Sequence, residues 1–236
     1  MPDREGTGPG WPAVAIRGGT VLDQNGERRA DLLVAGGQVM ALEATVAPPK
    51  GTTVLDAGGC LVCPGLVDLH THLREPGREE SETIETGTRA AALGGYTAVV
   101  AMPNTEPPLD SAEAVRNVYE LAAEASAEVA VAGAITVGRD GERLAPMAEM
   151  AAIGVRLFTD DGCGVQSAGL MRRALEYAGG LGVTLAQHCE DRTLAAGSPA
   201  TPNDAVELVY AAYLARIACK WVICRAPLVN MGTRNG

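Results

Sequence analysis

The stretch Leu61-Val62-Cys63-Pro64-Gly65-Leu66-Val67-Asp68-Leu69-His70-Thr71-His72 decides the fold of this chain. Residues 61–69 are nearly all apolar, which predicts a strand covered on both faces, as in a parallel sheet. The run ends in His-Thr-His, and residues two apart on a strand point to the same side. His70 and His72 can therefore converge on one metal ion.

Downstream of this stretch, segments of helical and strand character alternate. Helices are expected at 82–93, 110–125, 144–152, 167–178 and 204–218, and strands at 96–101, 128–135, 155–158, 183–186 and 221–224. Gly94-Gly95 is a natural helix end, and Asp110 followed by Glu113 is a natural helix start. Repeated strand–helix units predict a parallel α/β fold, with about six units where a complete (β/α)8 barrel has eight.

Upstream, the segment from Val14 to Ala57 shows short apolar stretches separated by turn residues. This pattern predicts a small β-sandwich or meander at 13–58, preceded by a disordered leader at 1–12. Its strands are expected at 14–16, 20–22, 31–34, 39–42 and 53–55, with turns at Gln24-Asn25-Gly26 and Gly36-Gly37.

The composition argues against several classes of function. Nineteen Lys and Arg against 29 Asp and Glu give a formal net charge of -10, which disfavours partners such as nucleic acid or an anionic membrane. Neither a signal-peptide pattern nor an apolar span of about 18 residues is present, so a cytoplasmic, soluble protein is expected. The six cysteines should then be thiols, and we interpret Cys60 and Cys63 as ordinary packing residues.

The chain contains three histidines, His70, His72 and His188, and each falls at the C-terminal end of an expected strand. Parallel α/β barrels place their active sites at that end. Asp160-Asp161 ends another expected strand and can add a carboxylate that bridges two ions. Imidazole and carboxylate ligands without thiolate suit Zn²⁺ and leave room for a water molecule.

Four segments together resemble the amidohydrolase superfamily, and within it the dihydroorotases of the bacterial kind. They are Asp68-Leu69-His70-Thr71-His72-Leu73-Arg74-Glu75-Pro76-Gly77, Ala101-Met102-Pro103-Asn104-Thr105, Phe158-Thr159-Asp160-Asp161-Gly162 and Gln187-His188-Cys189-Glu190-Asp191. The resemblance implies a TIM-like (β/α)8 hydrolase barrel whose first part spans 59–197, and a two-zinc site. His70 and His72 would hold one ion, Asp161 would bridge, and His188 would hold the second ion.

The same resemblance implies the substrate and the reaction. Dihydroorotases interconvert dihydroorotate and N-carbamoyl-aspartate, an early step of pyrimidine synthesis. Arg74 and Asn104 match the residues that hold the carboxylate of this small anionic substrate, beside His72. The fork-shaped guanidinium of an arginine such as Arg74 can bind a carboxylate through two parallel hydrogen bonds. The family also allows a homo-oligomer or a complex with aspartate carbamoyltransferase.

The sequence departs from the family pattern after Gly197. The family has a fourth metal-binding histidine and a proton-shuttling aspartate, and the divergent tail at 198–236 supplies neither in the expected setting. We therefore expect an incomplete barrel with impaired or no activity. A hydantoinase or allantoinase is an alternative, although the Asp160-Asp161 pair stands where those enzymes have a lysine. A non-catalytic fragment or structural pseudoenzyme is another.

Overall fold

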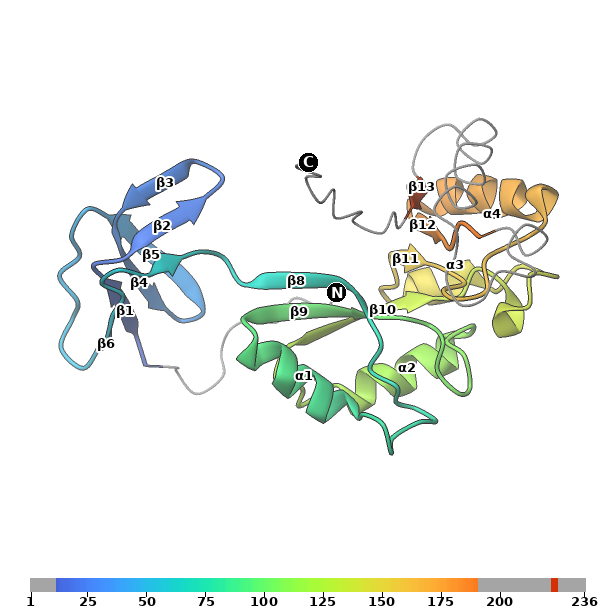
Figure 1. Ribbon diagram of the computed structural model, residues 1–236, viewed down its shortest axis with the longest axis horizontal. Coiled ribbons are helices and arrows are strands. Elements are labelled where there is room, and N and C mark those ends of the chain that lie inside the picture. The colour runs from blue at the N-terminus through green and yellow to red at the C-terminus, as the bar shows by residue number, and fades with distance from the viewer. Residues whose placement is uncertain (1–11, 191–221, 225–236) are drawn as a thin grey trace, which may run out of the picture. The chain divides into compact units, whose positions relative to one another are not determined.

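The computed structural model describes residues 12–190 and 222–224. Contacts divide the chain into two compact units, Met1–Gly65 and Leu66–Gly236, and their strands form separate sheets (Figure 1). The leader expected at 1–12 lies outside the described residues except for Pro12, and the helix expected at 204–218 lies wholly outside them.

The N-terminal unit contains two small sheets, one with the strand order β5-β4-β1-β6 and one with the order β3-β2-β7. The strands are β1 (Val14–Arg17), β2 (Thr20–Asp23), β3 (Gly26–Arg29), β4 (Asp31–Ala35), β5 (Gln38–Glu43), β6 (Thr53–Asp56) and β7 (Leu61–Val62). Strand β3 was not expected, because Gly-Glu-Arg-Arg carries no apolar side chain. It pairs with β2 across the turn at Gln24-Asn25.

The stretch expected to form one strand forms two. Strand β7 pairs with β2 in the N-terminal unit, whereas β8 (Leu66–Thr71) pairs with β9 in the second unit. Pro64 lies between them, and proline has no N–H for a sheet ladder. The expected cover on both faces is also wrong for β8, because Val67 is 55% and Leu69 is 64% exposed among the described residues.

The second unit is a parallel sheet whose strands follow one another in sequence order. The order β8-β9-β10-β11-β12-β13 has parallel pairing at every step. The strands after β8 are β9 (Tyr96–Ala101), β10 (Glu128–Gly133), β11 (Leu157–Phe158), β12 (Thr184–Gln187) and β13 (Val222–Cys224). An uninterrupted order of this kind is typical of a (β/α)8 barrel, since doubly wound sheets reverse direction at a switch point.

The α-helices are α1 (Ile84–Leu93), α2 (Ala112–Leu121), α3 (Met147–Ala152) and α4 (Ala168–Leu181), and a short 3-10 helix, η1 (Val137–Arg139), follows β10. Helix α2 begins at Ala112, two residues after the expected start, because Ser111 caps it and Asp110 instead accepts a hydrogen bond from the Gly138 N–H. Helix α3 begins at Met147, not at Leu144, which forms a bridge with Thr136. No helix among the described residues is long and apolar enough to cross a membrane.

The core of the second unit lies between its sheet and its helices. Helix α1 contacts β9, α2 contacts β10 and α4 contacts β12. Buried side chains from all of them form one apolar cluster, including Val99, Val115, Phe158 and Met171. The core fixes the strands in register, so the residues that follow each strand meet at one edge of the sheet.

Cys60 and Cys63 are exposed thiols. Our interpretation of the two as ordinary packing residues is therefore wrong.

Candidate metal centre

Six residues singled out from the sequence lie at the carboxyl ends of the parallel strands. His70 belongs to β8 and His72 follows it, and Asp161 lies in the loop after β11. Arg74 and Asn104 lie in the loops after β8 and β9, and His188 directly follows β12. The sheet order therefore brings these residues from distant parts of the sequence to the same edge.

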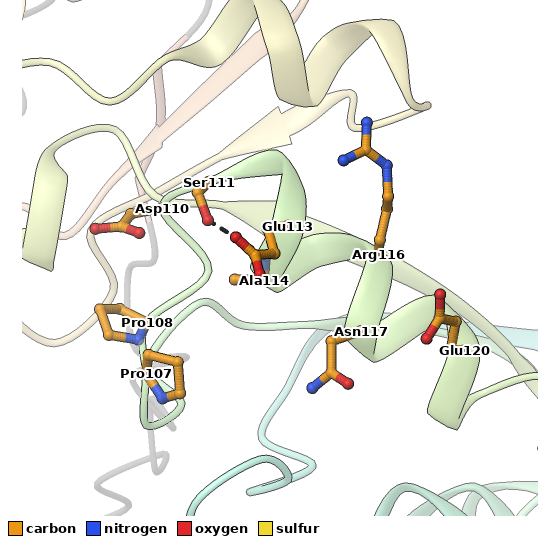
Figure 2. Close-up of a pocket in the computed structure, with 9 residues that line it drawn as sticks. All are labelled: Pro107, Pro108, Asp110, Ser111, Glu113, Ala114, Arg116, Asn117 and Glu120. Atoms are coloured by element: carbon orange, nitrogen blue, oxygen red, sulfur yellow. Dashed lines mark hydrogen bonds between the residues drawn. The ribbon is translucent and has the colours of Figure 1, made fainter.

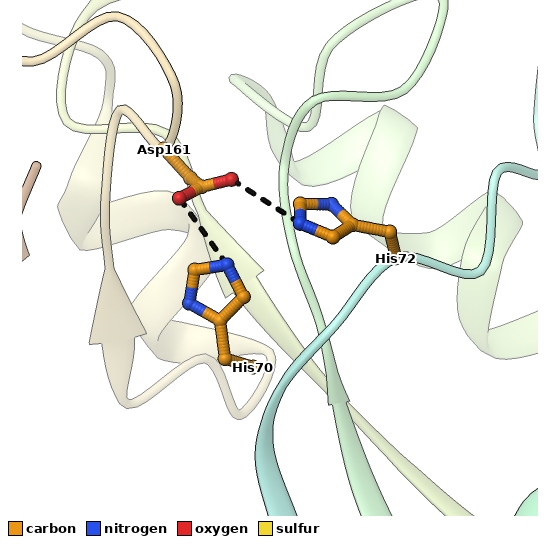
Figure 3. A group of neighbouring side chains, drawn as sticks. All are labelled: His70, His72 and Asp161. Carbon is orange, nitrogen blue, oxygen red and sulfur yellow. Dashed lines mark ion pairs between the residues drawn. The ribbon is translucent and has the colours of Figure 1, made fainter. Parts of the chain in front are cut away.

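Three of the residues converge on a single point (Figure 3). Nε2 of His70 lies 3.2 Å from Oδ1 of Asp161, and Nε2 of His72 lies 3.6 Å from Oδ2 of the same carboxylate. One ligand atom from each residue lies within 4.8 Å of the other two. The Asp161 side chain is only 10% exposed, so its charge faces the two imidazoles more than solvent.

Asn104 determines which nitrogen of His72 faces this point. Nδ1 of His72 lies 3.0 Å from Oδ1 of Asn104. An amide oxygen can only accept a hydrogen bond, so Nδ1 carries the proton and Nε2 keeps its lone pair in the neutral ring. That lone pair faces a carboxylate oxygen. Two electron-pair donors so placed are stabilised by a cation between them.

The donor set fits a metal ion. Two imidazole nitrogens and one carboxylate match the three protein ligands of many catalytic zinc sites, which leave a further position open. Outer hydrogen bonds to the ligating histidines, such as that from His72 to Asn104, are a regular feature of such sites. The candidate metal centre is therefore defined as His70, His72 and Asp161.

His188 does not join these three residues. Its Nε2 lies 3.1 Å from Oε2 of Glu190, and the two side chains form an ion pair when the imidazole is protonated. Gly164, in the Asp161 loop, has a φ of 62° and lies so close to the His188 carbonyl that a β-carbon would collide with it. The loops after β11 and β12 are therefore packed tightly, with His188 at their junction.

The loops after β8 and β9 are also tied together. The Met102 N–H donates to the Thr71 carbonyl at 2.9 Å, and the Glu106 N–H donates to the Pro76 carbonyl at 3.0 Å. Gly77 has a φ of 103°, and a β-carbon there would collide with the Glu106 carbonyl. These contacts hold the loop that carries Arg74 against the loop that carries Asn104.

Asp160 lies next to the candidate ligand but has a different role. It is fully buried and accepts hydrogen bonds from the N–H groups of Ile135 and Thr136 at 2.8 and 3.1 Å, and from the Thr136 hydroxyl. Burial raises the pKa of the Asp160 carboxyl, against the opposing effects of these hydrogen bonds and of the Arg139 charge. Sequence reasoning missed Thr136 and Arg139, because neither belongs to a recognisable motif.

Replacing Asn104 with alanine is expected to weaken Zn²⁺ binding about 10- to 100-fold, as for other outer partners of ligating histidines. The variant releases the His72 ring and its tautomer without removing a donor atom of the centre. Competition with a chromophoric chelator measures the dissociation constant. Asn117→Ala, on the exposed face of α2, is the control. An unchanged constant for Asn104→Ala would show that His72 needs no such support.

A pocket of about 500 Å³ lies beside α2, and none of the three residues of the candidate metal centre lines it (Figure 2). It is lined by the Pro107-Pro108 turn and by polar side chains of the helix, including Glu113, Arg116 and Glu120. Neither a histidine nor a cysteine lines it, and of its three acidic residues Asp110 accepts a hydrogen bond from the Gly138 N–H.

Known proteins resemble this chain over most of its length. A family described as dihydro-orotase-like matches residues 59–230. The dihydroorotase of Pelotomaculum thermopropionicum is 48% identical over 186 residues, which cover 78% of this chain and 43% of that protein. The dihydroorotase of Mycobacterium tuberculosis is 48% identical over 191 residues, which cover 80% of this chain and 44% of that protein.

Solved structures share the fold. The L-hydantoinase of Arthrobacter aurescens superposes with a TM-score of 0.74 at 23% identity, covering 89% of this chain and 51% of that one. The match confirms the expected α/β fold, an incomplete TIM-like (β/α)8 barrel preceded by a small β domain. The chain spans less than half the length of the curated relatives above, at 43% and 44%. The family match also confirms the resemblance carried by the four sequence segments: the chain belongs to the dihydroorotase-like family.

Proposed function

We propose that this chain carries the zinc site and the substrate-carboxylate site of a dihydroorotase, which interconverts dihydroorotate and N-carbamoyl-L-aspartate. The observation that carries the proposal is the Asp161 carboxylate, which lies 3.2 Å from His70 and 3.6 Å from His72 in a chain of this family. An aspartate at this position, in place of a lysine, favours a dihydroorotase over a hydantoinase.

His70 and His72 would hold the first zinc ion, and the Asp161 carboxylate, which faces both imidazoles, would be shared between the first and a second ion. His188 would be a ligand of that second ion once its imidazole leaves Glu190. When bound, the ions would acidify a water molecule and polarise the amide carbonyl of the substrate. The Asn104 side chain keeps the proton of His72 on Nδ1, away from the metal.

Arg74 and Asn104 would bind the substrate carboxylate. Arg74 is half-buried, and its guanidinium forms no ion pair within the described ranges 12–190 and 222–224. The neighbouring acids are engaged elsewhere: Glu75 accepts from the Ile84 N–H, and Glu79 accepts from the Gly77 N–H. The amide nitrogen of Asn104 remains as a donor, since its oxygen accepts from His72.

The dependence of ligand binding on Arg74 tests this proposal. With the zinc-loaded 236-residue chain, N-carbamoyl-L-aspartate should bind measurably by NMR titration, and Arg74→Met should weaken it about 10- to 100-fold, the value of a charge-assisted pair. Arg78→Met, an exposed arginine of the same loop, should leave binding unchanged.

Turnover completes the test. Dihydroorotases use a fourth metal-binding histidine, whereas this chain has three histidines, the last at position 188. We therefore expect slow or undetectable hydrolysis of dihydroorotate by this polypeptide alone. Hydrolysis of hydantoin or allantoin with none of dihydroorotate, or binding of N-carbamoyl-L-aspartate that ignores Arg74, would contradict the proposal.

A further inference from the structure

Two residues other than glycine have a positive φ among those the structure describes, and both are arginines in the connections that follow β8 and β10. Arg74 has a φ of 65° and Arg139 a φ of 57°. Such conformations are strained for residues with a β-carbon, and they persist where the surroundings hold them in place, often at functional sites. The proposed function already uses Arg74 but gives Arg139 no role.

The guanidinium of Arg139 reaches the loop that carries Asp161. Its Nη1 donates a 2.6 Å hydrogen bond to the main-chain carbonyl of Asp161. Its Nε is buried and has no hydrogen-bond partner among the described residues, which is unfavourable for a buried donor. The guanidinium is nevertheless held at the Asp161 carbonyl.

The bond from Arg139 acts on the peptide that joins Asp161 to Gly162. Gly162 follows Asp161 with a φ of 80°, and glycine gives the backbone its greatest freedom. Within the described residues, the main-chain N–H groups of Cys163 and Gly164 donate to the Asp160 carbonyl and not to that of Asp161. The Asp161–Gly162 peptide therefore depends on Arg139 for its orientation.

The preceding residue is held by the same segment. Asp160 accepts hydrogen bonds from Ile135 and Thr136, and the Thr136 hydroxyl in turn accepts from the Gly141 N–H at 3.0 Å. Residues 135–141, which follow β10, thus form hydrogen bonds to the Asp160-Asp161 pair at two points. One acceptor is the Asp160 carboxylate and the other is the Asp161 carbonyl.

We propose that Arg139 is a positioning residue of the metal centre. By fixing the peptide that follows Asp161, it sets the direction in which the Asp161 carboxylate faces His70 and His72, and so sets the affinity for the metal. Arginine suits this task because its planar guanidinium is always charged and its donors have fixed directions. The inference rests on the proposed function, since it requires Asp161 to be a ligand.

The test compares two arginines of the full chain. Arg139→Met removes the donors but keeps the aliphatic length, and Arg139→Lys keeps the charge without the fork. Arg156→Met is the matched control, because Arg156 also donates to main-chain carbonyls, those of Ala151 and Val155, but at the opposite end of β11. Zn²⁺ affinity is measured by chelator competition, and the visible spectrum of bound Co²⁺ reports ligand geometry.

Arg139→Met is expected to raise the Zn²⁺ dissociation constant about 10- to 100-fold and to change the Co²⁺ spectrum. Arg139→Lys should fall between it and the wild type, and Arg156→Met should match the wild type. Circular dichroism checks folding, and the lysine variant decides the matter should the methionine variant not fold.

Wild-type affinity and spectrum in the folded Arg139 variants, or an equal loss in Arg156→Met, would overturn the inference. Asp161→Asn separates this failure from that of the proposed function. If Asp161→Asn abolishes binding while the Arg139 variants keep it, only the positioning role is wrong. If Asp161→Asn also binds like the wild type, the metal centre itself is wrong.

Discussion

Phe158→Ala is expected to lower the free energy of unfolding by about 3–5 kcal/mol, the usual cost of removing a buried aromatic side chain. Phe158 is the one phenylalanine of the chain and is 0% exposed. It pairs with Gly133 across β10 and β11, and a β-carbon at Gly133 would lie 2.7 Å from its ring. The ring fills space that the glycine leaves, so alanine would open a cavity in the core of the second unit.

Urea unfolding measures this effect as a shift of the midpoint at constant slope. Phe158→Leu is the control and should cost less, because leucine refills part of the volume. A loss below about 1 kcal/mol for Phe158→Ala would mean that the ring is not packed as described.

Asp160→Ala is expected to destabilise the chain by at least about 3 kcal/mol, because it leaves three buried donors without an acceptor at about 1–3 kcal/mol each. These donors are the N–H groups of Ile135 and Thr136 and the Thr136 hydroxyl. Substitution of a metal-binding residue such as Asp161 should affect the metal centre alone, whereas Asp160→Ala should loosen both the turn after β10 and the metal centre.

Asp140→Ala provides the matched control in the same turn. Asp140 is exposed and accepts one hydrogen bond, from the Glu142 N–H. Its removal should cost no more than about 1 kcal/mol. Equal midpoints of urea unfolding for the two alanine variants would contradict a structural role of the Asp160 carboxylate.

Much of the second unit could be predicted from its sequence, because its signals are local. The strand at Tyr96–Ala101 has the expected bounds, and α1 differs from the expected helix only at its first turn. Apolar periodicity and glycine helix ends determine such elements with little help from tertiary contacts. Strand β8 is different, since its apolar run predicted a full cover that the described residues do not provide.

The candidate site was partly predictable for the same reason. The spacing of His70 and His72 on one strand places them together, and the family resemblance singled out Asp161 from the Asp160-Asp161 pair. The supporting contacts were not predictable. Arg139 reaches Asp161 through a main-chain carbonyl, and Asn104 reaches His72 across two loops. Contacts of this kind depend on loop conformation, which composition and periodicity do not encode.

Zinc binding by the 236-residue chain is the measurement that decides whether His70, His72 and Asp161 form a metal centre. Chelator competition on the wild type is expected to give about one tightly bound ion per chain. A variant with alanine at all three positions should bind at least about 100-fold more weakly, beyond the effect of losing an outer partner. Equal stoichiometry and affinity in the two folded proteins would contradict the assignment.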